Sequence, residues 1–490
     1  MSLSKPQLIR AYPRLYAALG AISLITITTA VLRRYWRAKE KTRWIDALPG
    51  PPGIPIFGNM FQLEKLNYLP QQLEQWAWEY GPLYKIKVGQ RVVVIISDPS
   101  IVQQQLKDRP HRLTRQPAVI TVFKELKMHG LFSNEGEEWK LSRQWIAPVF
   151  SPGKVAKGKH MMTHHALLLR ERFVEHARVH QATFDKWFPS DGAARVLYNP
   201  KEMPSLWEEI GERALAIMIN FAFAHGKEDF ISLKLIERLK SVFLSVNERV
   251  QSNFPTWRFY HTKQDRENLK TIEVLHEAVD QIIESLQKEQ QDERKDERMH
   301  TLLESLLYEK AGEQEEDEEN RILARSAEKA SRLTLDQIKG NLLQVIIAGY
   351  ETTANTTNNI LHLLATQSSA QARFHAEVDS VLGSLAQSTS VDDLGPILQQ
   401  DLTTLFPYTY AIVRESIRLH PASSFMATFT KEDWEIRGHV LPPGSLSILL
   451  VRTAALRRCP TPQPFEFRPE RWIEAGENER KIMSLDSSGF

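Results

Sequence analysis

The longest amphipathic pattern in the chain runs from Leu335 to about Ala365 and predicts a helix long enough to cross a whole domain. Apolar residues recur at near-helical spacing over its first half, at positions 335, 338, 342, 345 and 346. Thr334 stands directly before the pattern and Gln337 follows three residues later, which is the capping-box signature of a helix start. The pattern therefore predicts a central helix with a defined beginning.

The middle of this helix, Ala348-Gly349-Tyr350-Glu351-Thr352-Thr353, is unfavourable for helix formation. Glycine costs about 1 kcal/mol relative to alanine inside a helix, and it also removes side-chain bulk, so that a flat group could approach the backbone at Gly349. The hydroxyl of Thr352 can bond back to the carbonyl of Ala348. Glu351 and Thr352 place a carboxylate beside a hydroxyl, which suits proton transfer. Taken alone, the stretch also fits a core helix whose threonines only pack.

Shorter patterns predict further elements on both sides of this helix. The stretches 83–88 and 91–96 read as strands joined by a two-residue turn, and 446–451 reads as a buried strand. A helix is predicted over 71–80, and another begins at Asp98-Pro99. Residues 161–307 read as a run of amphipathic helices, whereas 110–132 shows no clear period.

Two more motifs follow the central helix. Glu415 and Arg418 stand three residues apart on a helix that must end before Pro421, and such a pair is by itself most often a surface ion pair. Arg471 follows within Pro469-Glu470-Arg471-Trp472. A buried carboxylate held by two guanidinium groups is satisfied, whereas removing one partner strands a charge. Glu415, Arg418 and Arg471 are therefore candidates for a structural ion triad.

The three motifs, in this order, resemble the cytochrome P-450 family of haem-thiolate monooxygenases. The family pattern A-G-x-E-T-T matches 348–353, E-x-x-R matches Glu415 and Arg418, and P-E-R-W/F matches 469–472. The resemblance implies a mainly α fold with small β-sheets. It also implies a haem cofactor, with O₂ and NADPH-derived electrons delivered by an NADPH-dependent reductase flavoprotein. The reaction implied is oxidation of a small apolar substrate, and a role in specialised metabolism is our interpretation.

The resemblance also assigns roles to individual residues. Trp139 and Arg143 are four residues apart, so they share a helix face, and the family pair at this spacing contacts the haem propionates. A half-buried tryptophan beside a surface arginine is the plainer interpretation. Ala348 and Gly349 would lie against haem, and Glu351 and Thr352 would deliver protons.

The resemblance further places a loop over the substrate at 110–132. It assigns the ion triad to folding around haem, not to chemistry. The basic residue that usually helps to bind haem would fall near Thr428, where this chain carries no charge.

The N-terminal region carries an uncharged run of 18 residues, 15–32, which is at the lower end of what spans a bilayer. A cleaved signal peptide is the competing interpretation, weakened by the basic stretch 33–37. Three basic residues precede the run and six follow it by position 43, which favours a cytosolic body. We expect residues 1–34 to form a membrane anchor, 35–56 a basic and proline-rich hinge, and 57–490 the catalytic domain.

This arrangement predicts a single-pass protein of the endoplasmic reticulum membrane, with lipid as a partner. The bulk composition adds limits. With 42% apolar and 25% charged residues the chain is ordinary for a globular protein, and its net charge of +2 shows no bias toward nucleic acid. The single cysteine, Cys459, excludes an internal disulfide, and no Cys or His cluster has zinc-ligand spacing.

The family's haem-ligand motif, F-x-x-G-x-R-x-C-x-G, is expected soon after P-E-R-W. The chain given ends at Phe490, about where that motif would begin, so we expect the axial cysteine just after it and no metal ligand within the chain. Cys459 precedes P-E-R-W, lacks the motif around it, and is predicted to be an unligated thiol. Two hypotheses follow: a monooxygenase represented by a truncated product, which is not competent as given, or a non-catalytic, membrane-tethered relative without haem.

Overall fold

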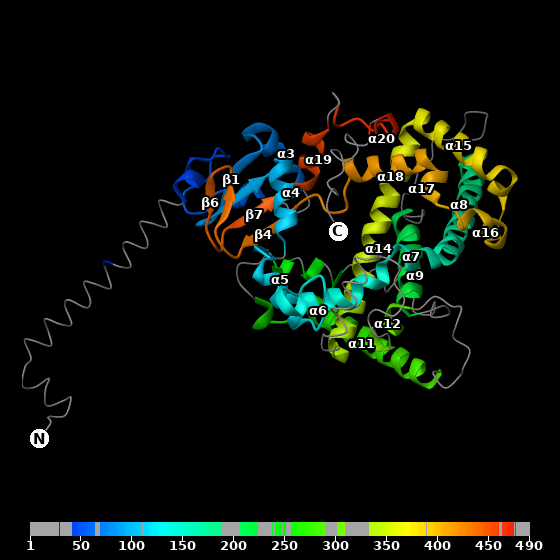
Figure 1. Cartoon of the computed structure of the whole chain (residues 1–490), viewed down its shortest axis with the longest axis horizontal. Helices are drawn as coiled ribbons and strands as arrows, with labels where there is room; N and C mark the ends of the chain where they lie inside the picture. The colour runs from blue at the N-terminus through cyan, green and yellow to red at the C-terminus, as the bar shows by residue number, and fades with distance from the viewer. Residues whose placement is uncertain are drawn as a thin grey trace, which may run out of the picture. The chain divides into compact units, whose positions relative to one another are not determined.

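The computed structural model describes residues 42–63, 69–109, 111–187, 206–223, 256–289, 301–308, 333–388, 390–459 and 463–474, with Thr29, Gly476 and a few positions between 238 and 250. The chain divides into two compact units (Figure 1). Unit 1 contains the described residues up to Thr114 together with Phe425–Ala454. Unit 2 contains Arg115–Ser424 and the described residues from Ala455 onward.

Unit 1 is built on a five-stranded sheet of order β1-β2-β7-β4-β3. The strands are β1 (Leu83–Val88), β2 (Arg91–Ile96), β3 (Leu113–Thr114), β4 (Met426–Thr430) and β7 (Leu446–Leu449). The predicted hairpin is confirmed, because β1 pairs antiparallel with β2 through a turn in which Gly89 has φ 58°. β7 runs parallel to β2 and ends two residues before the predicted 451.

Both faces of β2 are buried, which explains its continuous apolar sequence. Val93 and Ile95 pack with Leu73 of α3 (Leu69–Tyr80), whereas Val94 and Ile96 pack on the opposite face with Val102 of α4 (Pro99–Asp108). Asp98 caps α4 as expected, accepting hydrogen bonds from the amides of the residues two and three positions on. Unit 1 also contains η1 (Met60–Leu63) and a small sheet of β5 (Trp434–Ile436) and β6 (His439–Leu441).

Unit 2 is helical in its described part. Its longer helices are α5 (Pro117–Glu125), α6 (Gly136–Ile146), α8 (Lys159–Trp187), α9 (Leu206–Phe223), α11 (Lys263–Glu289), α14 (Leu335–Thr366), α15 (Ser368–Leu382) and α18 (Pro407–Leu419). Shorter turns are η3 (Ala147–Phe150), α7 (Pro152–Lys157), η6 (Thr256–Arg258), α12 (Leu302–Tyr308), η7 (Gly383–Gln387), η8 (Asp392–Leu394), α16 (Gly395–Leu398), α17 (Leu402–Leu405) and α20 (Arg471–Glu474). α19 (Val451–Arg458) begins in unit 1 and ends in unit 2. The prediction of a mainly α fold with small sheets is confirmed.

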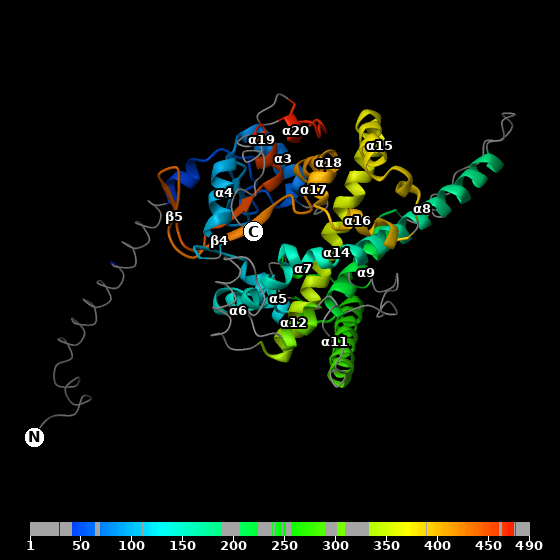
Figure 2. The ribbon, with the colours of Figure 1, turned by 45° about the vertical axis from the view of Figure 1, so that its right-hand side comes forward.

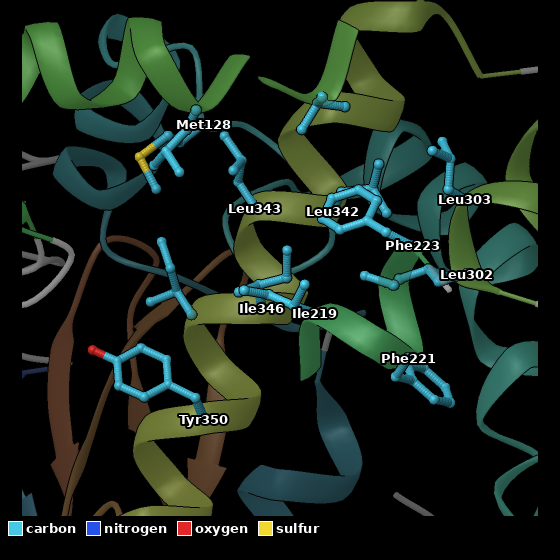
Figure 3. Packing of buried hydrophobic residues seen from close by; sticks show 14 of the residues in the cluster. Met128, Ile219, Phe221, Phe223, Leu302, Leu303, Leu342, Leu343, Ile346 and Tyr350 are labelled. Atoms are coloured by element: carbon cyan, nitrogen blue, oxygen red, sulfur yellow. The ribbon is translucent and has the colours of Figure 1, made fainter. Parts of the chain in front are cut away.

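The predicted central helix is α14, which runs unbroken through unit 2 with α9 and α11 beside it (Figure 2). Its capping box is confirmed: Thr334 N–H donates to Gln337 Oε1 at 2.9 Å, and Gln337 N–H donates to Thr334 Oγ1 at 3.3 Å. Apolar side chains of α14 meet those of α9 and α12 in the main core (Figure 3). This burial fixes the helix that carries the candidate chemistry.

The predicted anchor, 15–32, lies outside the described residues except for Thr29. Within the part of the chain that the structure describes, no helix combines the length and the apolar character needed to cross a bilayer. Part of the proline-rich stretch predicted to be a hinge packs on β1, where Lys85 N–H donates to Pro49 O at 2.9 Å. The expected haem-ligand loop, beyond Phe490, also falls outside the described residues.

Candidate functional site

The centre of α14 presents small residues to solvent. Ala348, Thr352 and Thr353 are exposed, although the helix is buried along most of its preceding half. The predicted back bond is confirmed: Thr352 Oγ1 donates to Ala348 O at 2.8 Å, and Thr356 Oγ1 repeats the pattern with Thr352 O at 2.9 Å. Because the Thr352 proton is directed to its own helix, the oxygen lone pairs remain available on an exposed surface.

Gly349 lies against the side chain of Met218, and not against open space that a flat group could enter. A Cβ at this position would lie 2.5 Å from Met218 Sδ, so the side chain of Met218 on α9 occupies the space that the glycine leaves. Close approach at Gly349 is therefore made by the protein itself. The exposed small residue of this turn is Ala348, and a haem contact at Gly349 stays a prediction.

The residues beside Thr352 differ sharply in environment. Tyr350 is buried in the main core, and burial, with the nearby charge of Glu351, raises its pKa to about 12. Glu351 is only partly buried. The tyrosine is thus a neutral packing residue, whereas Glu351 remains accessible to solvent for proton exchange.

The predicted ion triad is confirmed as a unit. The side chains of Glu415, Arg418 and Arg471 are 0%, 2% and 1% exposed. Arg418 donates to both Glu415 oxygens, with Nε to Oε2 and Nη2 to Oε1 each at 2.8 Å, and Arg471 Nε donates to Oε1 at 2.8 Å. Trp472 Nε1 and the Arg468 amide donate to the same carboxylate at 2.9 and 3.1 Å. Five donors thus satisfy one buried carboxylate.

This environment settles the charge of Glu415. Burial alone would raise its pKa, but the hydrogen bonds and charges of Arg418, joined by the Arg468 amide and Arg471, outweigh burial and lower the pKa below the ordinary value. The arginines also hold the chain before α20, because Arg418 Nη1 donates to Pro464 O at 2.7 Å and Arg471 Nη2 to Glu466 O at 3.2 Å. The triad therefore fixes backbone, as expected of a structural site.

Cys459 lies at the edge of this triad. Arg471 Nη1 donates to its sulfur at 3.2 Å. No sequence pattern predicted this interaction. Within the described ranges, no group of three or more His, Cys, Asp or Glu side chains is arranged to hold a metal ion. The thiol therefore packs against a structural arginine.

Trp139 and Arg143 share a face of α6 as predicted, with the guanidinium carbon 5.7 Å from the indole ring centroid. Both side chains are partly exposed. Within the part of the chain that the structure describes, Arg143 forms no ion pair with a carboxylate and the indole N–H of Trp139 donates to none. An indole N–H and a guanidinium without an acidic partner fit an external carboxylate.

Thr428, where a basic haem contact would fall in the resembled family, belongs to the core of unit 1. It is fully buried, and its hydroxyl lies 3.2 Å from Gln105 Oε1 and 2.8 Å from Ser447 Oγ. The position therefore packs the sheet of unit 1.

Two buried amides were missed by sequence reasoning. Asn341 and Gln344 lie on α14 and bond to the backbone of residues 128–133. The sequence signal for these two residues was the presence of polar amides inside an otherwise apolar helical pattern. Amide side chains also occur on exposed helix faces, so this signal alone does not indicate a buried role. Their contacts across about 210 positions of sequence could not be read from the pattern.

Comparison with known proteins gives a matching family model and a set of similar proteins. The family model described as Cytochrome P-450 matches residues 48–485. Cytochrome P-450 2E1 of Mus musculus is 24% identical over 469 residues, covering 92% of this chain and 82% of that protein. Cytochrome P-450 4d2 of Drosophila melanogaster is 24% identical over 92% of this chain and 84% of its own length. Carnosic acid synthase of Rosmarinus officinalis is 24% identical, covering 87% of this chain and 77% of that enzyme.

Proposed function

The chain belongs to the cytochrome P-450 family, and from this premise we propose that it is a monooxygenase that oxidises a small apolar molecule. The family uses haem, O₂ and electrons delivered by a reductase. The observation that carries the proposal is the exposed surface of Ala348, Thr352 and Thr353 at the centre of α14. Small side chains, two of them with a hydroxyl, suit close contact with a flat, apolar ring.

The residues present fit haem. Ala348 would lie against the ring, and the N–H donors of Trp139 and Arg143 would hold its carboxylates. When bound, haem supplies the activation of dioxygen. We do not assign the role of axial thiolate to Cys459, whose sulfur accepts a hydrogen bond from Arg471.

The chain's own contribution is to hold and move a proton. Thr352 Oγ1 donates to Ala348 O, so it can accept a hydrogen bond from a donor on the exposed side and hold a proton there. Glu351 is adjacent and reaches solvent, from which it can be reprotonated. Thr352 would therefore position the proton, and Glu351 would renew it.

The substrate and setting are the finer parts of this proposal. Relatives named carnosic acid synthase occur in two plants, which supports an apolar, specialised-metabolite substrate. We further propose that residues 15–32 span the endoplasmic reticulum membrane, with 1–14 lumenal and the body cytosolic, on the basis of the uncharged run and its basic flanks. Protease added to intact microsomes should digest the body, and full protection of the body would reverse this topology.

The functional test compares two threonines that make the same back bond. In protein expressed from its full coding frame, Thr352→Ala should retain substrate binding but divert NADPH consumption from product to hydrogen peroxide. Thr356→Ala, which also loses a hydroxyl bonded to a helix carbonyl, should keep the wild-type ratio of product to NADPH. If coupling is equally unchanged in both variants, Thr352 does not control proton delivery.

A further inference from the structure

Helix α9 contacts α14 at two points, one on each side of Thr352. On the C-terminal side, Trp207 Nε1 donates to Asn355 Oδ1 at 2.7 Å. On the N-terminal side, the side chain of Met218 fills the space at Gly349, where a Cβ would lie 2.5 Å from the sulfur. Both α14 positions are three residues from Thr352. The two α9 contacts therefore bracket the turn that carries this threonine.

Each of the two α9 contacts lies next to a hydrogen bond of Thr352. The Thr352 hydroxyl donates to Ala348 O at 2.8 Å, and Ala348 directly precedes Gly349. The Thr352 carbonyl accepts a hydrogen bond from Thr356 Oγ1 at 2.9 Å, and Thr356 directly follows Asn355. A displacement of the backbone at either contact would therefore move a hydrogen-bond partner of Thr352.

The two α9 contacts differ in kind from the apolar core beside them. Ile219 of α9 and Ile346 of α14 belong to this core (Figure 3). Burial of apolar surface is non-directional, so by itself it resists rotation of α14 about its axis only weakly. A hydrogen bond has a preferred direction, and the fit of Met218 against Gly349 leaves no room for a Cβ. Both contacts therefore oppose such a rotation.

The two α9 contacts can be altered separately. Trp207, Gly211 and Met218 are spaced by four and seven residues, so they lie along one stripe of α9. Gly211 is buried, yet no atom of another described element lies within 4 Å of the position that its Cβ would take. The stripe is thus open between the two contacts, and a substitution at Trp207 acts on α14 at Asn355 without disturbing Met218.

We infer that the two α9 contacts hold the α14 turn that carries Thr352 in position for proton transfer. The positioning residues are Trp207 and Met218, with Asn355 as the partner on α14. They keep the Thr352 hydroxyl directed to Ala348 O and its lone pairs available on the exposed surface. The inference rests on the proposed function. None of the three positioning groups touches the reacting atoms in this account, because they act through the backbone of α14.

The first test measures hydrogen–deuterium exchange of the segment 352–356 by mass spectrometry, in the full chain, and needs no bound haem. Trp207→Phe keeps an aromatic ring but removes the donor. It should raise the exchange rate of this segment about fivefold, as expected for loss of one hydrogen bond. Trp44→Phe is the matched control, because it removes an indole hydrogen bond to Val440 O in unit 1. Unchanged exchange in Trp207→Phe would overturn the inference.

A double-mutant cycle shows whether Trp207 acts through Asn355. Asn355→Leu removes the acceptor with little change in size, and should raise exchange of the segment 352–356 as much as Trp207→Phe does. The double variant should show no further increase, because both substitutions remove the same hydrogen bond. Additive increases would show that the two side chains act separately, which contradicts the inference. If Trp207→Phe does not fold, Asn355→Leu decides alone.

The second test measures product formed per NADPH consumed, in protein expressed from its full coding frame. Trp207→Phe should lower this ratio about threefold, within the range expected for one hydrogen bond, and hydrogen peroxide should rise in its place. The dissociation constant of the substrate should stay at the wild-type value, because the loss lies in proton delivery. Trp44→Phe should keep both the ratio and the affinity.

The outcomes separate this inference from the function on which it rests. Raised exchange with an unchanged product ratio in Trp207→Phe would make the contact purely structural and overturn the inference. A lowered ratio in Thr352→Ala would then leave the proposed function standing. If Thr352→Ala itself keeps the wild-type ratio, Thr352 does not control proton delivery, and the inference falls with that part of the proposed function.

Discussion

Replacing the buried Arg471 by methionine should destabilise unit 2 more than the same replacement of an arginine on the surface of unit 2. Glu415 is fully buried and its charge is balanced by two guanidinium groups, so Arg471→Met leaves one cation for the carboxylate. The variant also loses the bonds from Arg471 to Glu466 O and to the sulfur of Cys459. Breaking a buried ion pair by removing one partner costs about 3–5 kcal/mol. We expect a loss of this size.

A neighbouring arginine provides the control. Arg468 pairs with Glu474 at the surface, where the side chains are 42% and 58% exposed, and its link to the triad is through its backbone amide. Arg468→Met keeps that amide, so it should cost no more than about 1 kcal/mol. Urea-induced unfolding followed by far-ultraviolet circular dichroism compares the two variants. Equal transition midpoints for the two variants would refute the claim that the triad is a main support of the fold.

Three further results are expected. The folded pKa of Glu415 lies below its unfolded value. The triad's contribution to the unfolding free energy is therefore complete above the unfolded pKa and is lost as pH falls through the folded pKa. Acidification should therefore lower the unfolding free energy of Arg471→Met by less than that of the wild type. Gly340→Ala should destabilise the protein by about 1–3 kcal/mol, because the added Cβ would meet the backbone of a neighbouring segment. Gly211→Ala, where a Cβ would meet open space, should stabilise the protein by about 1 kcal/mol. The midpoints of urea-induced unfolding test both results. Gly349→Ala should lower the thermal midpoint, and Met218→Ala in the same chain should recover part of the loss; no recovery would contradict the Met218 contact.

Local signals in the sequence were sufficient for several elements. The capping box at Thr334 and the strand pair around Gly89 each depend on residues only a few positions apart, so pattern and turn chemistry determine them. The ion triad was also found, because its motifs occur in a family order. The capping box and the strand pair are each determined by residues within a short stretch, and the triad was identified from a combination of motifs typical of the family.

Long-range packing was beyond sequence reasoning. The region 110–132 shows no clear period, yet it contains α5, which begins with Pro117 at its first turn, a signal too short to outweigh the missing pattern. The space beside Gly349 is filled by Met218 from another helix, and Gln344 binds a loop distant in sequence. Such contacts depend on where helices meet, which no single stretch of residues specifies.

The central proposal is that the protein, expressed from its full coding frame, holds a thiolate-ligated haem beside Ala348 and Thr352. The most direct test is the absorbance of protein expressed from its full coding frame, purified with haem, reduced, and exposed to carbon monoxide. The account predicts the red-shifted Soret band of a thiolate-ligated haem, and predicts that replacing both Trp139 and Arg143 with alanine lowers the haem content. Haem-free protein, or a carbonyl band without thiolate character, would contradict it.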